Sequence, residues 1–118
     1  MSNKTKGKAG EDIAKNYLQK NGYEILDTNF HYSRYGEIDI IAYKKDTISF
    51  VEVKYRTKNT FGEGLEAITK SKLEKIHLSA KYYLSISKKK FKNYQIDAIS
   101  ILKDNNEEKI THIKNIEF

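Results

Sequence analysis

The sequence predicts one mixed α/β domain over residues 1–118, in which helices pack against a mixed β-sheet in the order α-β-β-β-α-β-β. Two long segments carry apolar residues at helical spacing, and five shorter runs rich in Ile, Val, Phe and Tyr lie between polar turns. The chain of 118 residues has no proline, and 38% of its residues are hydrophobic. A chain of this length suits a single core and is too short for two.

The first half of the chain is predicted to form one helix and three strands. A helix is predicted over residues 9–21 because one face of this segment is apolar, and Gly22 is its stop signal. That face consists of Ile13, Ala14, Tyr17 and Leu18. Residues 1–8, which include three lysines, are expected to be a mobile basic arm. The three strands are predicted at residues 23–30, 37–43 and 47–55.

The second half is predicted to form a helix and a pair of strands. The helix spans residues 69–87, where Ser71 and Glu74 fit a capping box. Its apolar face consists of Leu73, Ile76, Ala80, Tyr83 and Leu84. A polar, glycine-containing segment at residues 57–64 precedes it and is expected to be a mobile loop. The two strands are predicted at residues 94–102 and 110–116, on either side of Asp104-Asn105-Asn106.

Charged residues interrupt the most apolar part of the sequence, which is the predicted central hairpin. A tight turn at Lys45 and Asp46 would place Asp39 directly opposite Glu52, with their Cβ atoms about 5 Å apart. In this register the opposed apolar pairs are Tyr43 with Ile48 and Ile41 with Phe50. Lys54 lies two residues beyond Glu52 and therefore projects from the same face of its strand.

This combination of side chains predicts a metal site for phosphate chemistry. Two carboxylates at such a distance repel each other unless a cation lies between them or one of them binds a proton. Carboxylate oxygens suit Mg²⁺ or Mn²⁺, and a lysine beside them suits a phosphate oxygen or an attacking water. These are the components of metal-assisted phosphodiester hydrolysis. The alternative is an exposed salt bridge on an edge hairpin, which the apolar flanking residues disfavour.

Two further acids lie in apolar surroundings. Glu11 is on the same helical face as Ala14 and Leu18, which is expected to pack on the sheet. It either belongs to the acidic site or stabilises the helix through the helix dipole. Asp97 interrupts an apolar strand and is expected to have a structural role, as an acceptor of hydrogen bonds from the backbone or from a lysine.

The overall charge favours a polyanionic partner. The chain has 22 Lys and Arg residues against 16 Asp and Glu, a formal net charge of +6, which suits nucleic acid. Lys88, Lys89, Lys90 and Lys92 most simply form a solvated loop, with phosphate contact as the alternative. The chain has no cysteine, no apolar leader and no apolar stretch of about 20 residues, so we expect a cytoplasmic protein without membrane contact.

The motifs also resemble those of a known family. The residues concerned cover nearly the whole chain and include Gly10-Glu11, Gly22-Tyr23, Gly36-Glu37-Ile38-Asp39-Ile40-Ile41, Phe50-Val51-Glu52-Val53-Lys54-Tyr55-Arg56, Phe61-Gly62, Lys72, Ala80 and Asp97. They are similar to the YraN-like family of predicted bacterial endonucleases. That family belongs to the PD-(D/E)xK nuclease superfamily and is similar to archaeal Holliday-junction resolvases. The resemblance implies a restriction-endonuclease-like core and nuclease chemistry, but no particular substrate. We expect the substrate to be DNA, with branched DNA as one possibility.

The resemblance also implies roles for individual residues. Asp39 and Glu52 would hold Mg²⁺, for which Mn²⁺ can substitute, Glu11 would complete the acidic cluster, and Lys54 would be catalytic. The carbonyl of Val53 is expected to join the metal ligands. The nearest expected phosphate contacts are Arg56 and Lys72. One departure is Gln95, because the family commonly has an arginine there, and this weakens any inference of a phosphate contact at that position.

Two other functions remain open from the sequence. One is a nucleic-acid-binding module that keeps the nuclease fold without catalysis, which explains charge and fold equally well. The other is a small RNA-binding protein unrelated to nucleases, which leaves the acidic cluster unexplained. The sequence does not distinguish DNA from RNA, branched from linear substrates, one metal ion from two, or a monomer from a homodimer.

Overall fold

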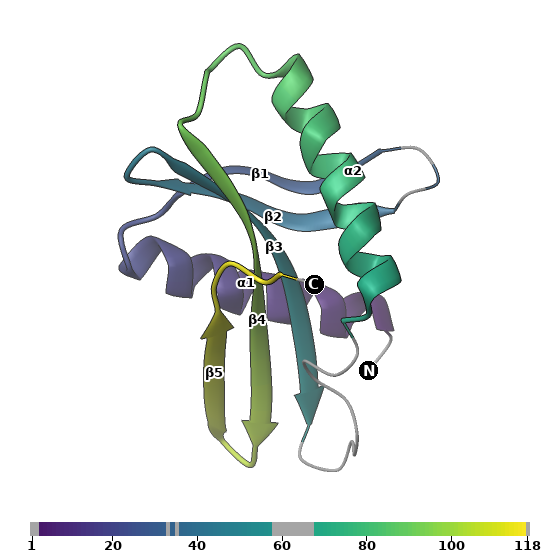
Figure 1. Cartoon of the computed structure of the whole chain (residues 1–118). Helices are drawn as coiled ribbons and strands as arrows, with labels where there is room; N and C mark the ends of the chain where they lie inside the picture. Colours follow the sequence, from purple (N-terminus) through teal and green to yellow (C-terminus); the bar gives the residue numbers. More distant parts are fainter. Residues whose placement is uncertain (1–2, 33, 35, 58–67, 118) are drawn as a thin grey trace.

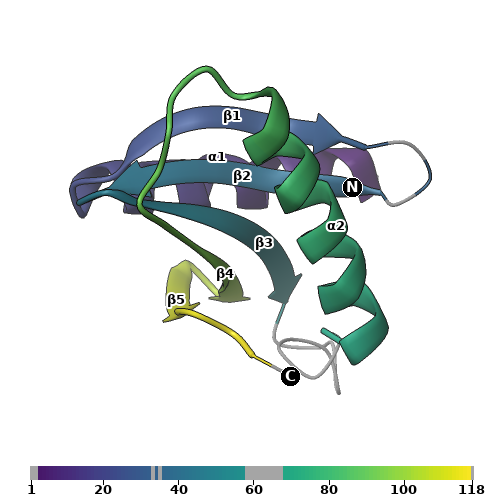
Figure 2. The same cartoon turned by 45° about the horizontal axis from the view of Figure 1, so that its top comes forward.

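The computed structural model describes residues 3–32, 34, 36–57 and 68–117 and shows a mixed β-sheet with a helix on each face (Figures 1 and 2). Its elements are α1 (Asn3–Lys20), β1 (Glu24–His31), β2 (Glu37–Lys44), β3 (Thr47–Thr57), α2 (Lys70–Ile86), β4 (Asn93–Asp104) and β5 (Glu107–Ile113). The predicted element order is therefore confirmed. Most of the loop expected at residues 57–64 lies outside the described residues.

The five strands lie in the order β1-β2-β3-β4-β5, so each strand pairs with its neighbour in the sequence. All pairs are antiparallel except β3 and β4, which are parallel over the whole length of β3. Parallel neighbours need a crossover connection, and α2 lies within it. The same connection brings the N-terminal end of α2 to the sheet near the middle of β3.

The central hairpin has the predicted register. Lys45 and Asp46 both have positive φ, 50° and 63°, as the common two-residue hairpin turn requires. The pairs Ile41 with Phe50 and Tyr43 with Ile48 are present. Backbone pairing continues to Ile40 and Val51, and Asp39 and Glu52 are the next residues in line. The site residues therefore lie where the paired part of the hairpin ends.

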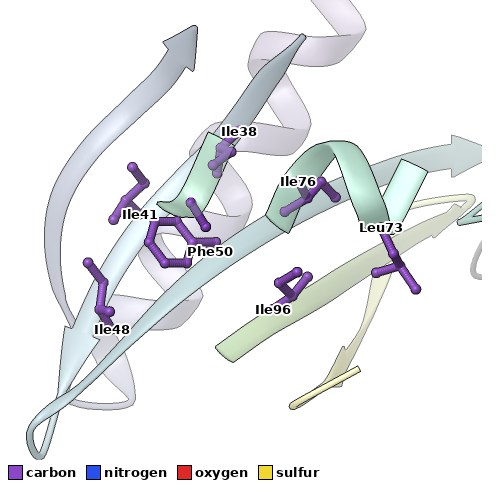
Figure 3. Close-up of a cluster of buried hydrophobic side chains, with 8 residues drawn as sticks. Ile38, Ile41, Ile48, Phe50, Leu73, Ile76 and Ile96 are labelled. Carbon is purple, nitrogen blue, oxygen red and sulfur yellow. The ribbon is translucent and has the colours of Figure 1, made fainter. Parts of the chain in front are cut away.

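The apolar face of the hairpin packs against α2 (Figure 3). The buried members of this cluster are Ile38, Ile41, Ile48, Phe50, Leu73, Ile76, Ala80 and Ile96. Full burial of a large apolar side chain stabilises a fold by about 1.5–3 kcal/mol. This packing fixes the position of α2 relative to β2 and β3, and with it the side chains that α2 places beside Asp39 and Glu52.

The opposite face of the sheet packs against α1. Ala14 and Leu18 are fully buried in a second apolar cluster with residues of β2, β3 and β4. A Cβ atom at Gly10 would lie 2.8 Å from Cβ of Tyr55, so α1 approaches β3 too closely for any side chain there. The helix begins at Asn3, six residues earlier than predicted, so residues 3–8 of the expected basic arm are helical in this structure.

Two further predictions about the ends of elements were wrong, the cap of α2 and the start of β5. The N-cap of α2 is Thr69, whose hydroxyl accepts a hydrogen bond from the N–H of Lys72 at 3.1 Å. Ser71 is consequently inside the first turn and does not form the predicted capping box with Glu74. β5 begins at Glu107, three residues earlier than predicted, because the turn after β4 is shorter than the polar sequence suggests.

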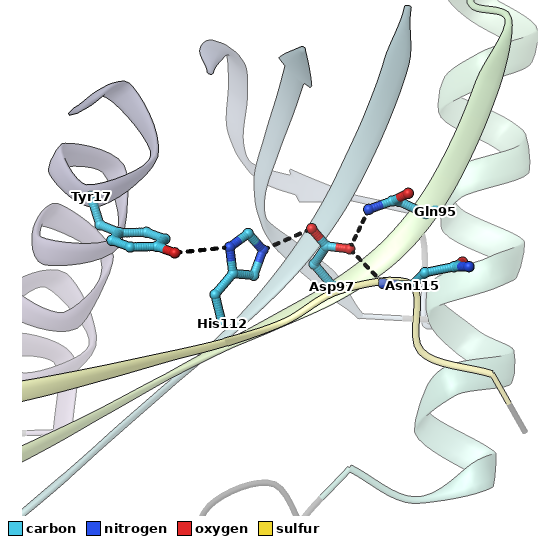
Figure 4. A network of polar contacts seen from close by, with 5 residues as sticks. All are labelled: Tyr17, Gln95, Asp97, His112 and Asn115. Atoms are coloured by element: carbon cyan, nitrogen blue, oxygen red, sulfur yellow. Dashed lines mark hydrogen bonds and ion pairs between the residues drawn. The ribbon is translucent and has the colours of Figure 1, made fainter. Parts of the chain in front are cut away.

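A buried polar network joins α1 to β4, β5 and the segment after β5 (Figure 4). Asp97 is fully buried on β4 and accepts hydrogen bonds from the Gln95 side chain at 2.9 Å and the Asn115 N–H at 3.0 Å. His112 Nε2 lies 2.9 Å from the other Asp97 oxygen, and its Nδ1 lies 3.3 Å from the Tyr17 hydroxyl. The structure therefore confirms that Asp97 is a hydrogen-bond acceptor, and it places His112 as a partner.

Removing the Asp97 carboxylate should destabilise the fold strongly. We expect Asp97→Ala to lower the free energy of unfolding by about 3 kcal/mol, because buried donors would lose their acceptor. Asp97→Asn should cost clearly less, since its carbonyl oxygen can still accept from Gln95 and Asn115. Urea denaturation measures both, with the exposed Asp12→Ala as the control, expected within about 0.5 kcal/mol of wild type. Equal stability of the Asp97→Ala and Asp12→Ala proteins would contradict a structural role for the network.

Candidate active site

Asp39 and Glu52 open into one pocket of about 440 Å³ on the α2 side of the sheet. It is formed by the start of β2, the middle of β3 and the first turns of α2. The residues that line it are Gly36, Glu37, Asp39, Glu52, Thr69, Ser71, Lys72, Lys75 and Ile76. The two carboxylates that the hairpin register predicts as neighbours therefore do converge, and they share a single pocket.

Asp39 is held against β3 by one of its own oxygens. The N–H of Val53 donates a hydrogen bond to Asp39 Oδ2 at 2.7 Å, which joins the two strands beyond their last backbone pair. Burial, followed by the nearby charge of Glu52, raises the pKa of Asp39 to about 7, although the Val53 hydrogen bond acts in the opposite direction. The two carboxylates therefore repel each other in this pocket, as the sequence predicts.

Two lysines compensate the charge of Glu52. Glu52 is only 6% exposed, and its Oε1 lies 2.6 Å from Lys72 Nζ and 3.6 Å from Lys54 Nζ. Burial and the neighbouring Lys72 lower the pKa of Lys54. Burial is the largest single effect on Lys72 and disfavours its charged form, but the hydrogen bond and charge of Glu52, together with Lys54 and Asp39, raise the pKa of Lys72 overall. Lys54 is therefore the lysine that releases a proton more readily.

The rim of the pocket contains charged residues that the sequence argument did not single out. Glu37 lines the pocket, and its Oε2 lies 2.7 Å from Nε2 of His31. Glu37 could have been found, because it is two residues before Asp39 and so on the same strand face. Lys75 is one helical turn after Lys72, which also predicts a shared face. Gly36, at the entrance to β2, has a φ of 93° that favours glycine.

The structure does not bring every predicted residue into the pocket. Glu11 accepts a hydrogen bond from the Asn29 side chain at 2.8 Å, on the helix that covers the other face of the sheet. Within the described residues, no three His, Cys, Asp or Glu side chains are placed to hold one metal ion, so the expected completion of the acidic cluster by Glu11 is absent. Lys54 contacts Glu52 without lining the pocket, and Arg56 follows it on β3.

The remaining donor set still fits Mg²⁺ or Mn²⁺. Mg²⁺ keeps several waters and is commonly bound by one or two carboxylates together with substrate phosphate oxygens. Asp39 and Glu52 supply two carboxylates, and their mutual repulsion is the condition that a divalent cation relieves. Lys72 Nζ lies 2.6 Å from Glu52 and would have to move away from Oε1 if that oxygen bound a metal ion.

The fold and the pocket define a mixed α/β protein with a carboxylate and lysine site. The model of the uncharacterised protein family UPF0102 matches residues 10–101, so the chain belongs to this family. A UPF0102 protein from Syntrophomonas wolfei is 42% identical over 113 residues, covering 96% of this chain and 97% of that protein. One from Clostridium perfringens is 52% identical over 101 residues, covering 84% and 80%. One from Persephonella marina is 46% identical over 110 residues, covering 93% and 90%.

These relatives support the resemblance to the YraN-like family at the level of family membership. The matched region contains all the residues that line the pocket. Neither described helix is long and apolar enough to cross a membrane.

The raised pKa of Asp39 predicts a specific pH dependence of stability. The folded protein holds the Asp39 proton up to about pH 7, whereas the unfolded chain releases it near 3.8. Ionisation of Asp39 therefore costs stability as pH rises between these values. Without metal, Asp39→Asn should be more stable than wild type by up to about 4 kcal/mol at pH 8, and this advantage should disappear near pH 4.

Urea denaturation in EDTA at a series of pH values measures this difference. Asp12→Asn, which changes an exposed acid on α1, is the control and should show no such dependence. A stability difference between Asp39→Asn and wild type that stays constant from pH 4 to pH 8 would contradict the strained carboxylate pair.

Proposed function

We propose that this protein is a metal-dependent nuclease that hydrolyses phosphodiester bonds in nucleic acid, with DNA as its main substrate. The observation that carries the proposal is the carboxylate pair of half-buried Asp39 and buried Glu52 in one pocket, with Lys54 and Lys72 beside Glu52. The motif resemblance to PD-(D/E)xK nucleases and the mixed sheet with a helix on each face both support it. A restriction-endonuclease-like core is part of the proposal.

The acids and the lysines of the pocket would have different roles, metal binding and phosphate binding. Asp39 and Glu52 would hold one or two Mg²⁺ ions, which supply charge neutralisation and an activated water when bound. The Val53 N–H fixes one Asp39 oxygen, so the carboxylate keeps a defined orientation. Lys72 and Lys75 lie on one face of α2 at the pocket and are suited to hold phosphate oxygens near the carboxylates.

Lys54 is the residue proposed to act at the reacting phosphate. Its pKa is lowered by burial and by Lys72, and its amine lies 3.6 Å from Glu52. An amine in this position can orient an attacking water and stabilise negative charge that develops on the phosphate. Lys72, whose pKa is raised, would stay charged and contribute electrostatic stabilisation only.

A binding module without catalysis is the second candidate function, and one contact favours it. Lys72 Nζ pairs with Glu52 at 2.6 Å and so partly neutralises the acidic site without a metal ion. Such a pocket could persist for stability or for phosphate binding alone. The two functions differ in whether a divalent cation replaces this lysine at Glu52.

Cleavage assays test the proposal directly. The purified protein would be incubated with labelled duplex, single-stranded and four-way-junction DNA and with RNA, in Mg²⁺, Mn²⁺ or EDTA. We expect cleavage of at least one DNA substrate in Mg²⁺ or Mn²⁺ and none in EDTA. Tight, salt-dependent binding with no cleavage of any substrate would instead support the binding module.

Lys54→Ala should separate catalysis from binding. Removing an amine that acts at the reacting phosphate is expected to reduce cleavage about a hundredfold or more. Affinity for the same DNA in Ca²⁺ should change by less than about threefold, because binding comes mainly from the wider positive surface. Lys103→Ala, an exposed lysine on β4, is the matched control and should cleave like wild type. Unchanged cleavage by Lys54→Ala would point to a contaminating nuclease or another active site.

Asp39→Asn should keep the fold and lose metal binding. The amide cannot supply the charge that attracts a divalent cation, and it removes the repulsion that favours one. Calorimetric titration with Mn²⁺ should show at least a tenfold weaker affinity than wild type, with Asp12→Asn unchanged. If Asp39→Asn bound Mn²⁺ as tightly as wild type, the metal site would have to lie elsewhere.

A further inference from the structure

Most of the net positive charge lies at the end of the molecule opposite the pocket. The turn between β2 and β3 and the loop between α2 and β4 meet there, at residues 44–46 and 88–92. Six of these eight residues are lysines, and they define what we call the lysine surface: Lys44, Lys45, Lys88, Lys89, Lys90 and Lys92. With Asp46 included, the eight residues carry a formal charge of +5, so the remaining 110 residues carry only +1 of the total of +6.

The two segments of the lysine surface are held together by specific contacts. The N–H of Asn93 donates to the Asp46 carbonyl at 3.1 Å. Lys89 Nζ lies 3.9 Å from the centre of the Tyr43 ring, and the rings of Tyr43 and Phe91 are 5.5 Å apart. The loop is therefore packed against the hairpin tip, while its four lysines stay exposed, as expected of a solvated loop.

Five of the six lysines of this surface are available to an anion. Lys44 is half-buried, and its Nζ donates a hydrogen bond to the Asn21 carbonyl at 2.6 Å. Lys45, Lys88, Lys90 and Lys92 are exposed, and so is Lys89 above its ring. None of the six forms an ion pair with a carboxylate among the described residues. The neighbouring acids are Asp46, which accepts a hydrogen bond from the Tyr43 hydroxyl, and Glu24, which pairs with Tyr43 on β1.

The lysine surface lies a fixed distance from the proposed catalytic pocket. Thr47 is the first residue after the hairpin turn, and Glu52 lies five residues further along β3. These five residues of strand separate Glu52 from the turn by about 17 Å. The pocket is at the N-terminal end of α2, and Lys88–Lys90 follow its C-terminal end, about 25 Å along the 17-residue helix. A nucleic-acid strand advances about 3.4 Å per nucleotide in a duplex. The separation therefore corresponds to about five to seven nucleotides.

We propose that the lysine surface binds the phosphate backbone of the same nucleic acid, about five to seven nucleotides from the phosphate at the pocket. The proposal rests on the proposed function for the position of the pocket, and it adds a second contact region that sets the substrate's minimum length. Lysines that neutralise phosphates release counterions, so this surface supplies affinity that falls steeply with salt. The pocket itself, with its acidic pair, supplies little of that affinity.

Nucleic acid fits this surface better than an anionic membrane does. Membrane-surface binding by lysines is usually supported by apolar side chains that enter the bilayer. Here Tyr43 and Phe91 are half-buried and in contact with each other. The exposed large apolar side chains that flank the lysine segment are only Ile86 and Tyr94 among the described residues. The lysine surface and the proposed phosphodiester pocket are also separated by a distance that one continuous polyanion can span.

Binding measurements with two matched triple variants test the proposal. The first variant removes three charges from the lysine surface by the substitutions Lys88→Gln, Lys89→Gln and Lys90→Gln. The control variant removes three exposed charges from β4, β5 and the residue after β5, by the substitutions Lys103→Gln, Lys109→Gln and Lys114→Gln. Fluorescence anisotropy would follow a labelled duplex of about 20 base pairs in EDTA at about 50 mM salt, where no cleavage occurs. The first variant should bind at least tenfold more weakly than wild type. The slope of its log affinity against log salt concentration should be shallower by about 0.9 for each phosphate that it no longer neutralises. The control should bind within about twofold of wild type.

Three outcomes would overturn the proposal. The two triple variants could weaken binding equally, which would indicate net charge and no defined surface. The first variant could bind DNA like wild type. It could also lose binding to vesicles of anionic phospholipid while keeping its affinity for DNA, which would indicate a membrane partner. If the first variant does not fold, Lys88→Glu/Lys90→Glu, which leaves Lys89 on the Tyr43 ring, provides the same comparison.

The assay separates this proposal from the proposed catalytic function. If the wild type cleaves no substrate but the first variant loses binding, the nuclease proposal fails and the lysine surface stands. If the wild type cleaves and the first variant binds and cleaves a long duplex like wild type, the nuclease proposal stands and the lysine surface fails.

Discussion

The structure depends on one electrostatic constraint, which is that two carboxylates from adjacent strands share a partly buried pocket. Asp39 and Glu52 cannot both be ionised there without a compensating charge, and the raised pKa of Asp39 expresses that conflict. The chain supplies cations from two directions, with Lys54 on β3 and Lys72 on α2. Because α2 is the crossover between the parallel strands β3 and β4, the sheet topology itself delivers Lys72 to the acids.

Much of the fold and the centre of the site follow from local sequence patterns. The hairpin register follows from a two-residue turn at Lys45 and Asp46, and once it is fixed, Asp39 and Glu52 must be neighbours. Patterns of period 2 and 3.6 identify the strands and helices because each element buries one face or stripe. The ends of elements were less predictable, since Thr69 and Ser71 are both capable caps and only the backbone geometry selects Thr69.

The parts that the sequence did not predict depend on contacts between distant residues. The pairing of His112 with Asp97 joins two strands through side-chain packing, and no sequence spacing indicates it. The inward face of α1 was predicted, but the choice of Asn29 as the partner of Glu11 depends on how α1 lies across the sheet. The lysine surface likewise combines two segments more than 40 residues apart in the sequence. In each case a residue's role is set by tertiary geometry that local periodicity does not contain.

The central claim is that Asp39 and Glu52 form a divalent-metal site from which Lys72 is displaced. A crystal structure of the protein with Mn²⁺ tests it most directly, because anomalous scattering locates the metal independently of the protein atoms. We expect a peak with oxygens of Asp39 and Glu52 about 2.1 Å away, and Lys72 Nζ moved from its position 2.6 Å from Glu52. An anomalous map with no peak between the two carboxylates at millimolar Mn²⁺, and Lys72 still paired with Glu52, would contradict it.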